Sequence, residues 1–331
     1  MHWPHCCPKN STVFTPDIRI FRRWQRLSAN YEAVVAALLE QEPNEWQISL
    51  VHQGEQNTVY QGTAAGQPAV AVKHYAERAK AEREFAVLQG LREFGINLGP
   101  EPLALFAENK LSVMGWIDGT VMTHAPAVHD ETLWHRFMAA VGASGEIPYG
   151  PYQKLIPSQG NGYFSPGDMM DEIDRTLQNL DANHPLYETL IHLMQRVREQ
   201  VVPTWNLPIK IGLCRRDPDP RNLIWDGHHL LALDWEDADW GDMAAELGLW
   251  SAHPAYEEVP SSHWVWIRWE FGRLTHDPTL VPRATVYSRL GQVWWAVHLT
   301  AQLADREAEH SERVKLRDRY LKRIKTIFPA S

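Results

Sequence analysis

Two aspartates and an asparagine in the C-terminal half have a spacing that suits a metal-assisted reaction. In the segment CRRDPDPRNLIW, Asp217 is followed five positions later by Asn222, directly before an apolar run that is typical of a strand. In the segment LLALDWED, a second apolar run ends at Asp234. A loop Asp and Asn can converge with an aspartate at a neighbouring strand end, as in protein-kinase loops that hold a base and two magnesium ions. These residues predict a phosphoryl-transfer centre.

A lysine and a glutamate upstream could hold the phosphates in such a reaction. Lys73 lies in the alternating run AVAVKHY, whose strand period points its side chain away from the face of Val70 and Val72. Glu84 follows eleven positions later on a helical stretch, as expected for a strand lysine held by a helix glutamate. We expect this pair to aim the lysine ammonium at the α and β phosphates of a nucleotide.

A turn between the first two predicted strands would cover the same phosphates. It comprises Gly54, Glu55, Gln56 and Asn57, whose backbone amides could face the phosphate oxygens. The turn has no Gly-x-Gly-x-x-Gly motif, so its glycine signal comes from Gly54 alone.

The sequence predicts two structural parts that would position these residues, one rich in strands and one mainly helical. From Trp46 to Asp118, short apolar runs alternate with turns around one helical stretch, as in an antiparallel sheet with a helix. After Asp118, long helical periods dominate, with one β-hairpin at Asp226-Gly227. We predict an α+β protein with three parts: an extension over 1–45 with a leading helix at 17–42, a β-rich nucleotide-binding lobe over 46–118, and a mainly helical lobe over 119–331 that carries the catalytic loop and the acceptor site.

Composition indicates a folded protein that binds neither nucleic acid nor membrane. The 331 residues are 44% hydrophobic and 22% charged, which is ordinary for a chain with a buried core. The formal net charge of -9 argues against a nucleic-acid binder, which needs a basic face. No window approaches the run of about 20 apolar residues of a membrane helix, and the first residues lack the order of a secretory signal. Three cysteines cannot supply a disulfide framework, so we expect a cytoplasmic protein.

The succession of motifs resembles the aminoglycoside phosphotransferase and choline kinase group. The resemblance spans roughly residues 46 to 250 and rests on the strand with Lys73, the helix segment EREF, the strand LSVMGWIDG, the loop RRDPDPRN and the strand ALDWEDADWGD. It implies a bilobal protein-kinase-like fold, with a small antiparallel-β lobe and a larger helical lobe. It also implies ATP or GTP as donor, Mg2+ as cofactor, and a hydroxyl group of a small molecule as acceptor.

The resemblance implies a role for each position that matches the motifs. Asp217 would be the catalytic base, while Asn222 and Asp234 would be the magnesium ligands. Lys73 and Glu84 would be the ion pair that anchors the phosphates.

Two further positions follow from the same resemblance. The hinge whose backbone meets the purine would comprise Gly115, Trp116 and Ile117. Asp242, in WGDMAAEL, would brace the following helix rather than react.

The loop departs from the family pattern, which usually reads His-Gly-Asp-Leu-His-Pro-Gly-Asn. Here Arg215 and Arg216 precede the aspartate, Asp219 replaces the second histidine, and Arg221 replaces the second glycine. Because the first histidine normally braces the loop, we expect a different support, an ion pair of Arg215. Arg216 or Arg221 could instead face the phosphates or an anionic acceptor, since a planar guanidinium suits oxyanions.

Two groups of side chains near the motifs have alternative interpretations. An acidic cluster could bind an amine-bearing acceptor or form a solvated rim and helix caps; its members are Asp219, Glu236, Asp237 and Asp239. Several tryptophans could line a pocket for a flat or cationic acceptor, although core packing is the favoured interpretation; they are Trp250, Trp264, Trp266, Trp269, Trp294 and Trp295.

The predicted function is a small-molecule kinase whose partners are a nucleoside triphosphate and a small acceptor. The alternative is a catalytically inactive nucleotide-binding member of the same fold, motivated by the missing loop histidine and the sparse glycine turn. A protein kinase is disfavoured, because no activation-loop phosphosite followed by Ala-Pro-Glu comes after Asp234. The identity of the acceptor, the choice between ATP and GTP, and the oligomeric state stay open.

Overall fold

The described residues divide into two compact units. The computed structural model describes residues 46–54, 56–123, 126, 130–201, 207–304 and 311–328. One unit ends at Asp118 and the other begins at Gly119. The helix predicted for 17–42, and Glu55 of the predicted turn, lie outside the described residues.

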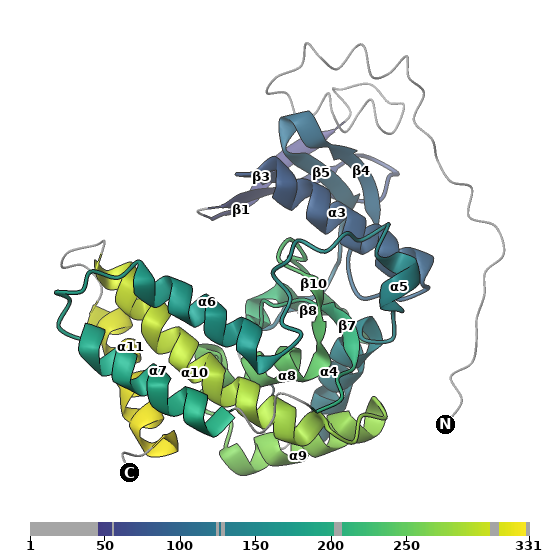
Figure 1. The fold of residues 1–331 in the computed structure, drawn as a ribbon. Coiled ribbons are helices and arrows are strands. Elements are labelled where there is room, and N and C mark those ends of the chain that lie inside the picture. The colour runs from purple at the N-terminus through teal and green to yellow at the C-terminus, as the bar shows by residue number, and fades with distance from the viewer. Residues whose placement is uncertain are drawn as a thin grey trace. The chain divides into compact units, whose positions relative to one another are not determined.

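The N-terminal unit is an antiparallel sheet with one long helix (Figure 1). Its strands pair in the order β1-β2-β3-β5-β4, and every neighbouring pair is antiparallel. The elements are β1 (Gln47–Gln53), β2 (Asn57–Thr63), β3 (Val70–Tyr75), α3 (Arg78–Glu93), β4 (Pro102–Phe106), the 3-10 turn η2 (Ala107–Asn109) and β5 (Leu111–Gly115).

The central strand β3 has an apolar face and a polar face. Val70 and Val72 join Val113 of β5 in a buried hydrophobic cluster. Since side chains alternate along a strand, Lys73 points to the opposite face, and its partner Glu84 lies on α3. The strand period therefore sets which side of the sheet carries charge.

The C-terminal unit is mainly helical, and its longest helix is α10 (Figure 1). Helix α10 packs against α6, α8, α9 and α11. The helices are α4 (Glu131–Ser144), α5 (Tyr149–Tyr152), α6 (Pro166–Gln178), α7 (Tyr187–Val201), α8 (Met243–Ala252), η5 (Pro254–Tyr256), α9 (Ser261–Leu274), α10 (Leu280–Ala304) and α11 (Ser311–Ile327).

Short strands interrupt these helices and fix both ends of the predicted catalytic loop. β7 pairs antiparallel with β10, and β8 lies between β6 and β9. Gly227, at φ 95°, turns the chain from β8 to β9, as the Asp226-Gly227 signature predicted. The elements are β6 (Thr120–Val121), β7 (Ile211–Cys214), η4 (Pro220–Asn222), β8 (Leu223–Trp225), β9 (Leu230–Ala232) and β10 (Asp239–Asp242).

The tryptophans of the helical unit pack partly in its core. Trp250 and Trp264 are almost fully buried, and the ring of Trp250 meets Phe137 edge-on at a centroid distance of 4.3 Å. Trp269 is 60% exposed, and the other three tryptophans of the predicted set are partly exposed. Core packing thus explains two of the six, and the other four keep part of their rings exposed.

The helices of the described part of the chain lack the combination of length and apolar character that crossing a membrane requires.

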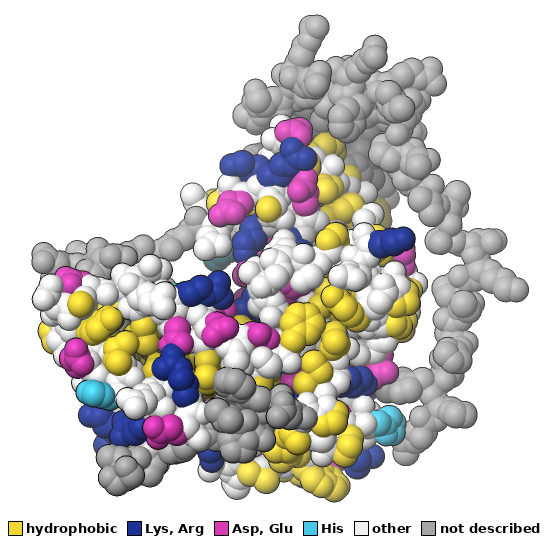
Figure 2. Space-filling view, viewed as in Figure 1, with side chains coloured by type: hydrophobic (Ala, Val, Ile, Leu, Met, Phe, Trp, Pro, Cys, Tyr) yellow, Lys and Arg dark blue, Asp and Glu magenta, His cyan; other side chains and the backbone are white. Residues whose placement is uncertain are grey.

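In the view of Figure 2, acidic, basic and hydrophobic side chains are interspersed over the helical unit.

Candidate active site

A buried ion pair joins β3 to α3 in the N-terminal unit. The Nζ atom of Lys73 lies 2.6 Å from Oε2 of Glu84, and both side chains are more than nine-tenths buried. Burial removes each charge from water, and the opposite charge of the partner compensates part of that cost. The structure brings together the two residues that the sequence paired by their spacing.

Two hydroxyl groups support this glutamate. The phenol of Tyr75 donates to the same Glu84 oxygen at 2.7 Å and lies 2.9 Å from the hydroxyl of Ser112. Since the phenol has one proton, Ser112 is the donor in the second contact. Burial, followed by the charge of Glu84, raises the pKa of Tyr75 well above its ordinary value, which keeps it a donor.

Sequence reasoning missed both hydroxyl groups, although a local signal was present. Tyr75 lies two positions after Lys73 and therefore on the same face of β3. Ser112 is the direct partner of Lys73 in the pairing of β3 with β5.

The predicted phosphate turn is closed by its own backbone. The amide of Gly54 donates to the carbonyl of Asn57 at 2.8 Å. A Cβ atom on Gly54 would lie 3.1 Å from Nε2 of His52, the end of an exposed side chain that can move aside, so this contact does not by itself require glycine. In this conformation Gly54 shapes the turn, and its amide is already engaged.

The predicted hinge uses two of its three amides internally. The amide of Gly115 donates to Glu101 at 2.8 Å, and the amide of Trp116 donates to Ala69 at 3.1 Å. The amide of Ile117 has no acceptor within the described part of the chain. Of the three predicted hinge residues, Ile117 thus has the amide that is left to bind a ligand.

The predicted base, Asp217, is held from both sides of its carboxylate. Oδ1 accepts from the amide of Asp219 at 3.0 Å, and Oδ2 accepts from the side-chain amide of Asn222. Burial raises the pKa of Asp217 above its ordinary value, while the positive charge of Arg215 opposes that rise. A carboxylate that is fixed in this way is suited to accept a hydrogen bond from a hydroxyl group.

Backbone pairing places Asn222 beside the strand that leads to Asp234. The carbonyl of Asn222 accepts from the amide of Leu233 at 2.8 Å. Asp234 follows directly, with a left-handed backbone at φ 62° that is uncommon for a residue other than glycine. The chain thus anchors the loop asparagine to the residue next to Asp234.

Arg215 supports the loop, but not through the expected ion pair. Its guanidinium donates to the carbonyl of Leu233 at 3.3 Å and lies over the ring of Trp250 at 5.1 Å. No carboxylate of the described residues forms an ion pair with it, although Arg215 is only 3% exposed. The prediction of an ion pair is therefore wrong. Neither a backbone carbonyl nor an aromatic face can be recognised from the sequence as the partner of an arginine.

Arg221, one of the two arginines for which the sequence left an oxyanion-binding role open, pairs within the loop. Its guanidinium pairs with Asp219, which in turn accepts from the Arg221 amide at 2.9 Å and caps η4. Burial raises the pKa of Asp219, but its bonds with Arg221 outweigh this, and the net shift is downward. In this conformation Arg221 serves the loop itself rather than an anionic ligand.

The acidic cluster has members with structural roles. Asp239 is fully buried and accepts from the backbone amides of Gln159, Asn161 and Trp240. With Asp219 paired as well, two of the four predicted acidic residues have roles within the fold. The structural interpretation is therefore the better one for Asp219 and Asp239.

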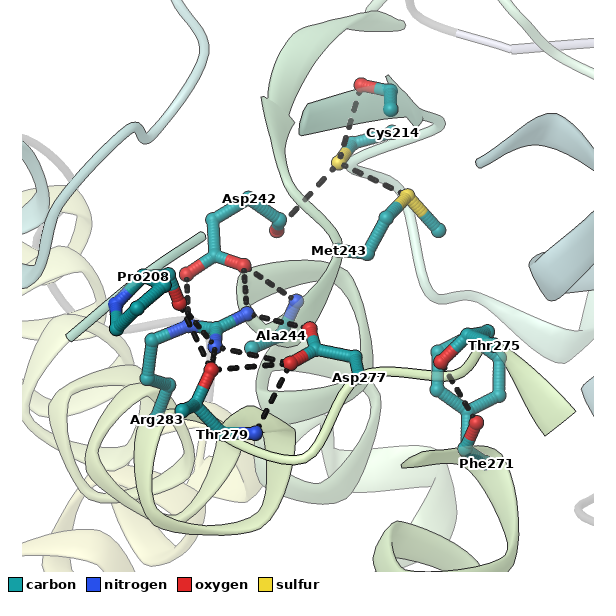
Figure 3. A network of polar contacts seen from close by, with 11 residues as sticks. Pro208, Cys214, Asp242, Met243, Ala244, Phe271, Thr275, Asp277, Thr279 and Arg283 are labelled. Carbon is teal, nitrogen blue, oxygen red and sulfur yellow. Dashed lines mark hydrogen bonds and ion pairs between the residues drawn. The ribbon is translucent and has the colours of Figure 1, made fainter. Parts of the chain in front are cut away.

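Asp242 braces the helix that follows it, as the resemblance implied (Figure 3). It is the N-cap of α8 and accepts from the amide of Ala244 at 2.9 Å. Arg283 of α10 donates to both of its carboxylate oxygens at 2.8 Å and also reaches Asp277. This buried network ties β10, α8 and α10 together.

Each unit thus presents groups that suit one part of a phosphoryl transfer. The N-terminal unit holds a buried ammonium group, which can bind phosphate oxygens. The helical unit holds a fixed carboxylate together with further amide and carboxylate groups, the oxygen donors that Mg2+ prefers.

Comparison with known protein families gives one match over most of the chain. A family model described as a phosphotransferase enzyme family, APH, matches residues 47–262. This range includes every predicted site residue from Gly54 to Asp234. A comparison with curated protein sequences finds no match.

Solved structures of kinases share the fold at low sequence identity. The ethanolamine kinase of Plasmodium vivax is 12% identical, with 97% of this chain and 98% of that chain covered and a TM-score of 0.64. The choline kinase LicA of Streptococcus pneumoniae is 14% identical, with 89% and 98% covered and a TM-score of 0.60. The ternary complex of APH(2'')-IIa with streptomycin and ATP is 12% identical, with 92% and 99% covered and a TM-score of 0.65. The predicted kinase-like fold is confirmed.

Proposed function

This chain belongs to the phosphotransferase enzyme family, and from that membership we propose that it transfers the γ-phosphate of ATP or GTP to a hydroxyl group of a small molecule. The match confirms the family and the enzyme class predicted from the sequence, a small-molecule kinase. The donor, the acceptor and the role of each residue are the content of the proposal.

The observation that carries the proposal is the hydrogen bond from Asn222 to Asp217. It orients the carboxylate of the proposed base and ties it to a proposed metal ligand. Asp217 would orient the acceptor hydroxyl and take its proton as the phosphoryl group is transferred.

The residues proposed to hold Mg2+ fit that ion. Because the side-chain nitrogen of Asn222 is used by Asp217, its amide oxygen is the atom left for a cation. Asp234 adds a carboxylate, and Mg2+ prefers such oxygen ligands. When bound, the ion would neutralise charge on the phosphates.

Two features of the N-terminal unit support nucleotide binding. Lys73, held by Glu84, would bind the α and β phosphates. The amide of Ile117 would donate to the purine, since the amides of Gly115 and Trp116 are engaged internally.

The experiment is Mg2+-dependent consumption of ATP and GTP by the purified protein with aminoglycosides, amino alcohols, sugars and nucleosides as acceptors. Asp217→Asn should lower turnover by orders of magnitude while nucleotide affinity stays within severalfold, because the base acts on the acceptor. The matched control is Asp171→Asn, which changes an exposed carboxylate on α6 and should leave turnover unchanged.

Three outcomes separate the interpretations. Acceptor-stimulated consumption that Asp217→Asn abolishes would establish the kinase. Nucleotide binding without turnover across the panel would favour the inactive nucleotide-binding alternative. Loss of nucleotide binding in Asp217→Asn, with unchanged turnover per bound complex, would contradict the assignment of the base.

A further inference from the structure

Arg216 has a backbone conformation that favours glycine. It lies directly before Asp217 with φ 67°, in the left-handed region. The family loop pattern usually has glycine at this position, which adopts such a φ without strain. An arginine here bears a backbone cost, and such strain is often retained at functional sites.

Contacts from two helices hold this strained residue. Its amide donates to Oε2 of Glu246, a buried residue of α8, at 3.0 Å. Its guanidinium lies over the ring of Tyr163 at 4.7 Å, and Nη2 lies 3.4 Å from Oε2 of Glu172 on α6. The side chain is thus directed and retained beside the catalytic loop.

Glu172 already has most of its hydrogen-bonding capacity in use. Its Oε2 accepts from the phenol of Tyr163 at 2.7 Å, and its Oε1 accepts from the indole of Trp294 at 2.8 Å. With the contact from Arg216 added, the carboxylate accepts three hydrogen bonds. It therefore has little capacity left for an amine of a ligand.

Arg216, by contrast, has more hydrogen-bond donors than it has acceptors to pair with them in the described part of the chain. Among the described residues, its one ion pair is a single long contact rather than a bidentate one. Its Nε atom is buried and has no hydrogen-bond partner within the described residues. A charged group that is largely removed from water normally has all of its donors paired.

Aromatic side chains lie next to this charged pair. Trp294 stacks on His298 at a centroid distance of 4.4 Å and an interplanar angle of 13°, and both are partly exposed. The side chains of Arg216 and Glu172 are 17% and 29% exposed, so neither is completely sealed from solvent. Flat aromatic rings and a cation with unpaired donors thus lie close together here.

We propose that Arg216 is a specificity residue that binds an oxyanion of the acceptor, so that the acceptor carries a carboxylate or a phosphate group as well as its hydroxyl group. This inference rests on the proposed function. A planar guanidinium is suited to either oxyanion. Binding of the acceptor next to the proposed base is the functional reason for an arginine at this strained backbone position.

The test uses the full-length protein and matched pairs of acceptors. Hydroxycarboxylic acids are compared with their amides, sugar phosphates with the free sugars, and amino alcohols serve as the cationic set. Binding is measured by calorimetry and phosphorylation by ATP consumption. The variant is Arg216→Gln, and the control is Arg175→Gln, which removes the same charge from an exposed position on α6.

We expect the protein to bind one class of anionic compound about tenfold or more tightly than its neutral partner, the effect of a charge-assisted hydrogen bond. Arg216→Gln should remove this preference and raise the KM for the acceptor more than it changes kcat, whereas Arg175→Gln should keep both. Preference for carboxylates or for phosphates would identify the oxyanion.

Other outcomes overturn the inference. Equal binding of charged and neutral partners, tighter binding of amino alcohols, or an unchanged preference in Arg216→Gln would each do so. Phosphorylation without an anion preference would leave the proposed kinase activity intact. Anion binding that depends on Arg216, without any phosphorylation, would instead count against the proposed activity.

Discussion

Arg283 and Asp242 form a bidentate ion pair that is almost completely removed from solvent. Both contacts are 2.8 Å long, and the two side chains are 1% and 0% exposed. The same guanidinium reaches Asp277, so a single cation serves two buried carboxylates (Figure 3). Because Asp242 ends β10 and caps α8, the pair links α10 to both of these elements.

Arg283→Met should destabilise the protein by about 3–5 kcal/mol, because it leaves two carboxylates buried without their cation. Arg283→Lys should be intermediate, since an ammonium keeps the charge but loses the planar fork. Calorimetric melting of both variants checks the order. Lys315→Met, which breaks an exposed pair with Glu312, should leave the melting temperature nearly unchanged. Equal melting of wild type and Arg283→Met would contradict the assigned role.

Lys73→Met should destabilise the N-terminal unit by about 3–5 kcal/mol, because the buried carboxylate of Glu84 would lose the cation that lies 2.6 Å from it. The double variant Lys73→Met/Glu84→Gln should be less destabilised than the single one, since it removes both charges. Thermal unfolding of the two variants and the wild type measures the difference. A double variant that melts as low as Lys73→Met would show that the cost comes from lost packing rather than from the unpaired charge.

The parts of the site that sequence reasoning could predict are local in the chain. Lys73 and Glu84 are eleven positions apart, and Asp217 and Asn222 are five apart. At these distances the strand period, the helix start and the loop length constrain where side chains can point. The alternation of strands and helical periods likewise predicted a β-rich part followed by a helical part.

The parts that could not be predicted involve partners that are distant in sequence. Arg216 reaches Glu246 and Glu172 across 30 and 44 positions, and Asp242 meets Arg283 across 41. Helix packing decides such pairs, and one sequence carries no pattern for them. Arg215 shows a second limit, because a carbonyl can accept from it whatever residue bears that carbonyl.

Arg216→Gly should be more stable than Arg216→Ala by about 1 kcal/mol. Both variants remove the guanidinium, but only glycine adopts φ 67° without strain. The greater freedom of unfolded glycine reduces this gain. Chemical unfolding of the two variants under identical conditions measures it. If alanine proved equally stable, the backbone at this position would not be strained, and the argument from its cost would fail.

Because of His253, the protein should become less stable as the pH falls from 6.5 toward about 4. Burial, outweighing the charge of Asp219, lowers the pKa of His253 to about 4 from an ordinary 6.5. Between these values the unfolded chain binds a proton that the folded chain excludes, so its contribution is full above pH 6.5 and is lost toward pH 4. The loss amounts to about 3 kcal/mol at most.

The matched variant for this prediction is His253→Asn. In the wild type, Nδ1 of His253 accepts from the amide of Ala255 at 3.2 Å and caps η5, which requires that nitrogen to be unprotonated. Asparagine keeps a capping acceptor but does not titrate. Melting temperatures measured from about pH 7 down to about pH 4.5 should therefore fall more steeply for the wild type than for the variant. Parallel curves would mean that other groups cause the acid sensitivity and that His253 accepts a proton in the folded state as readily as in the unfolded one.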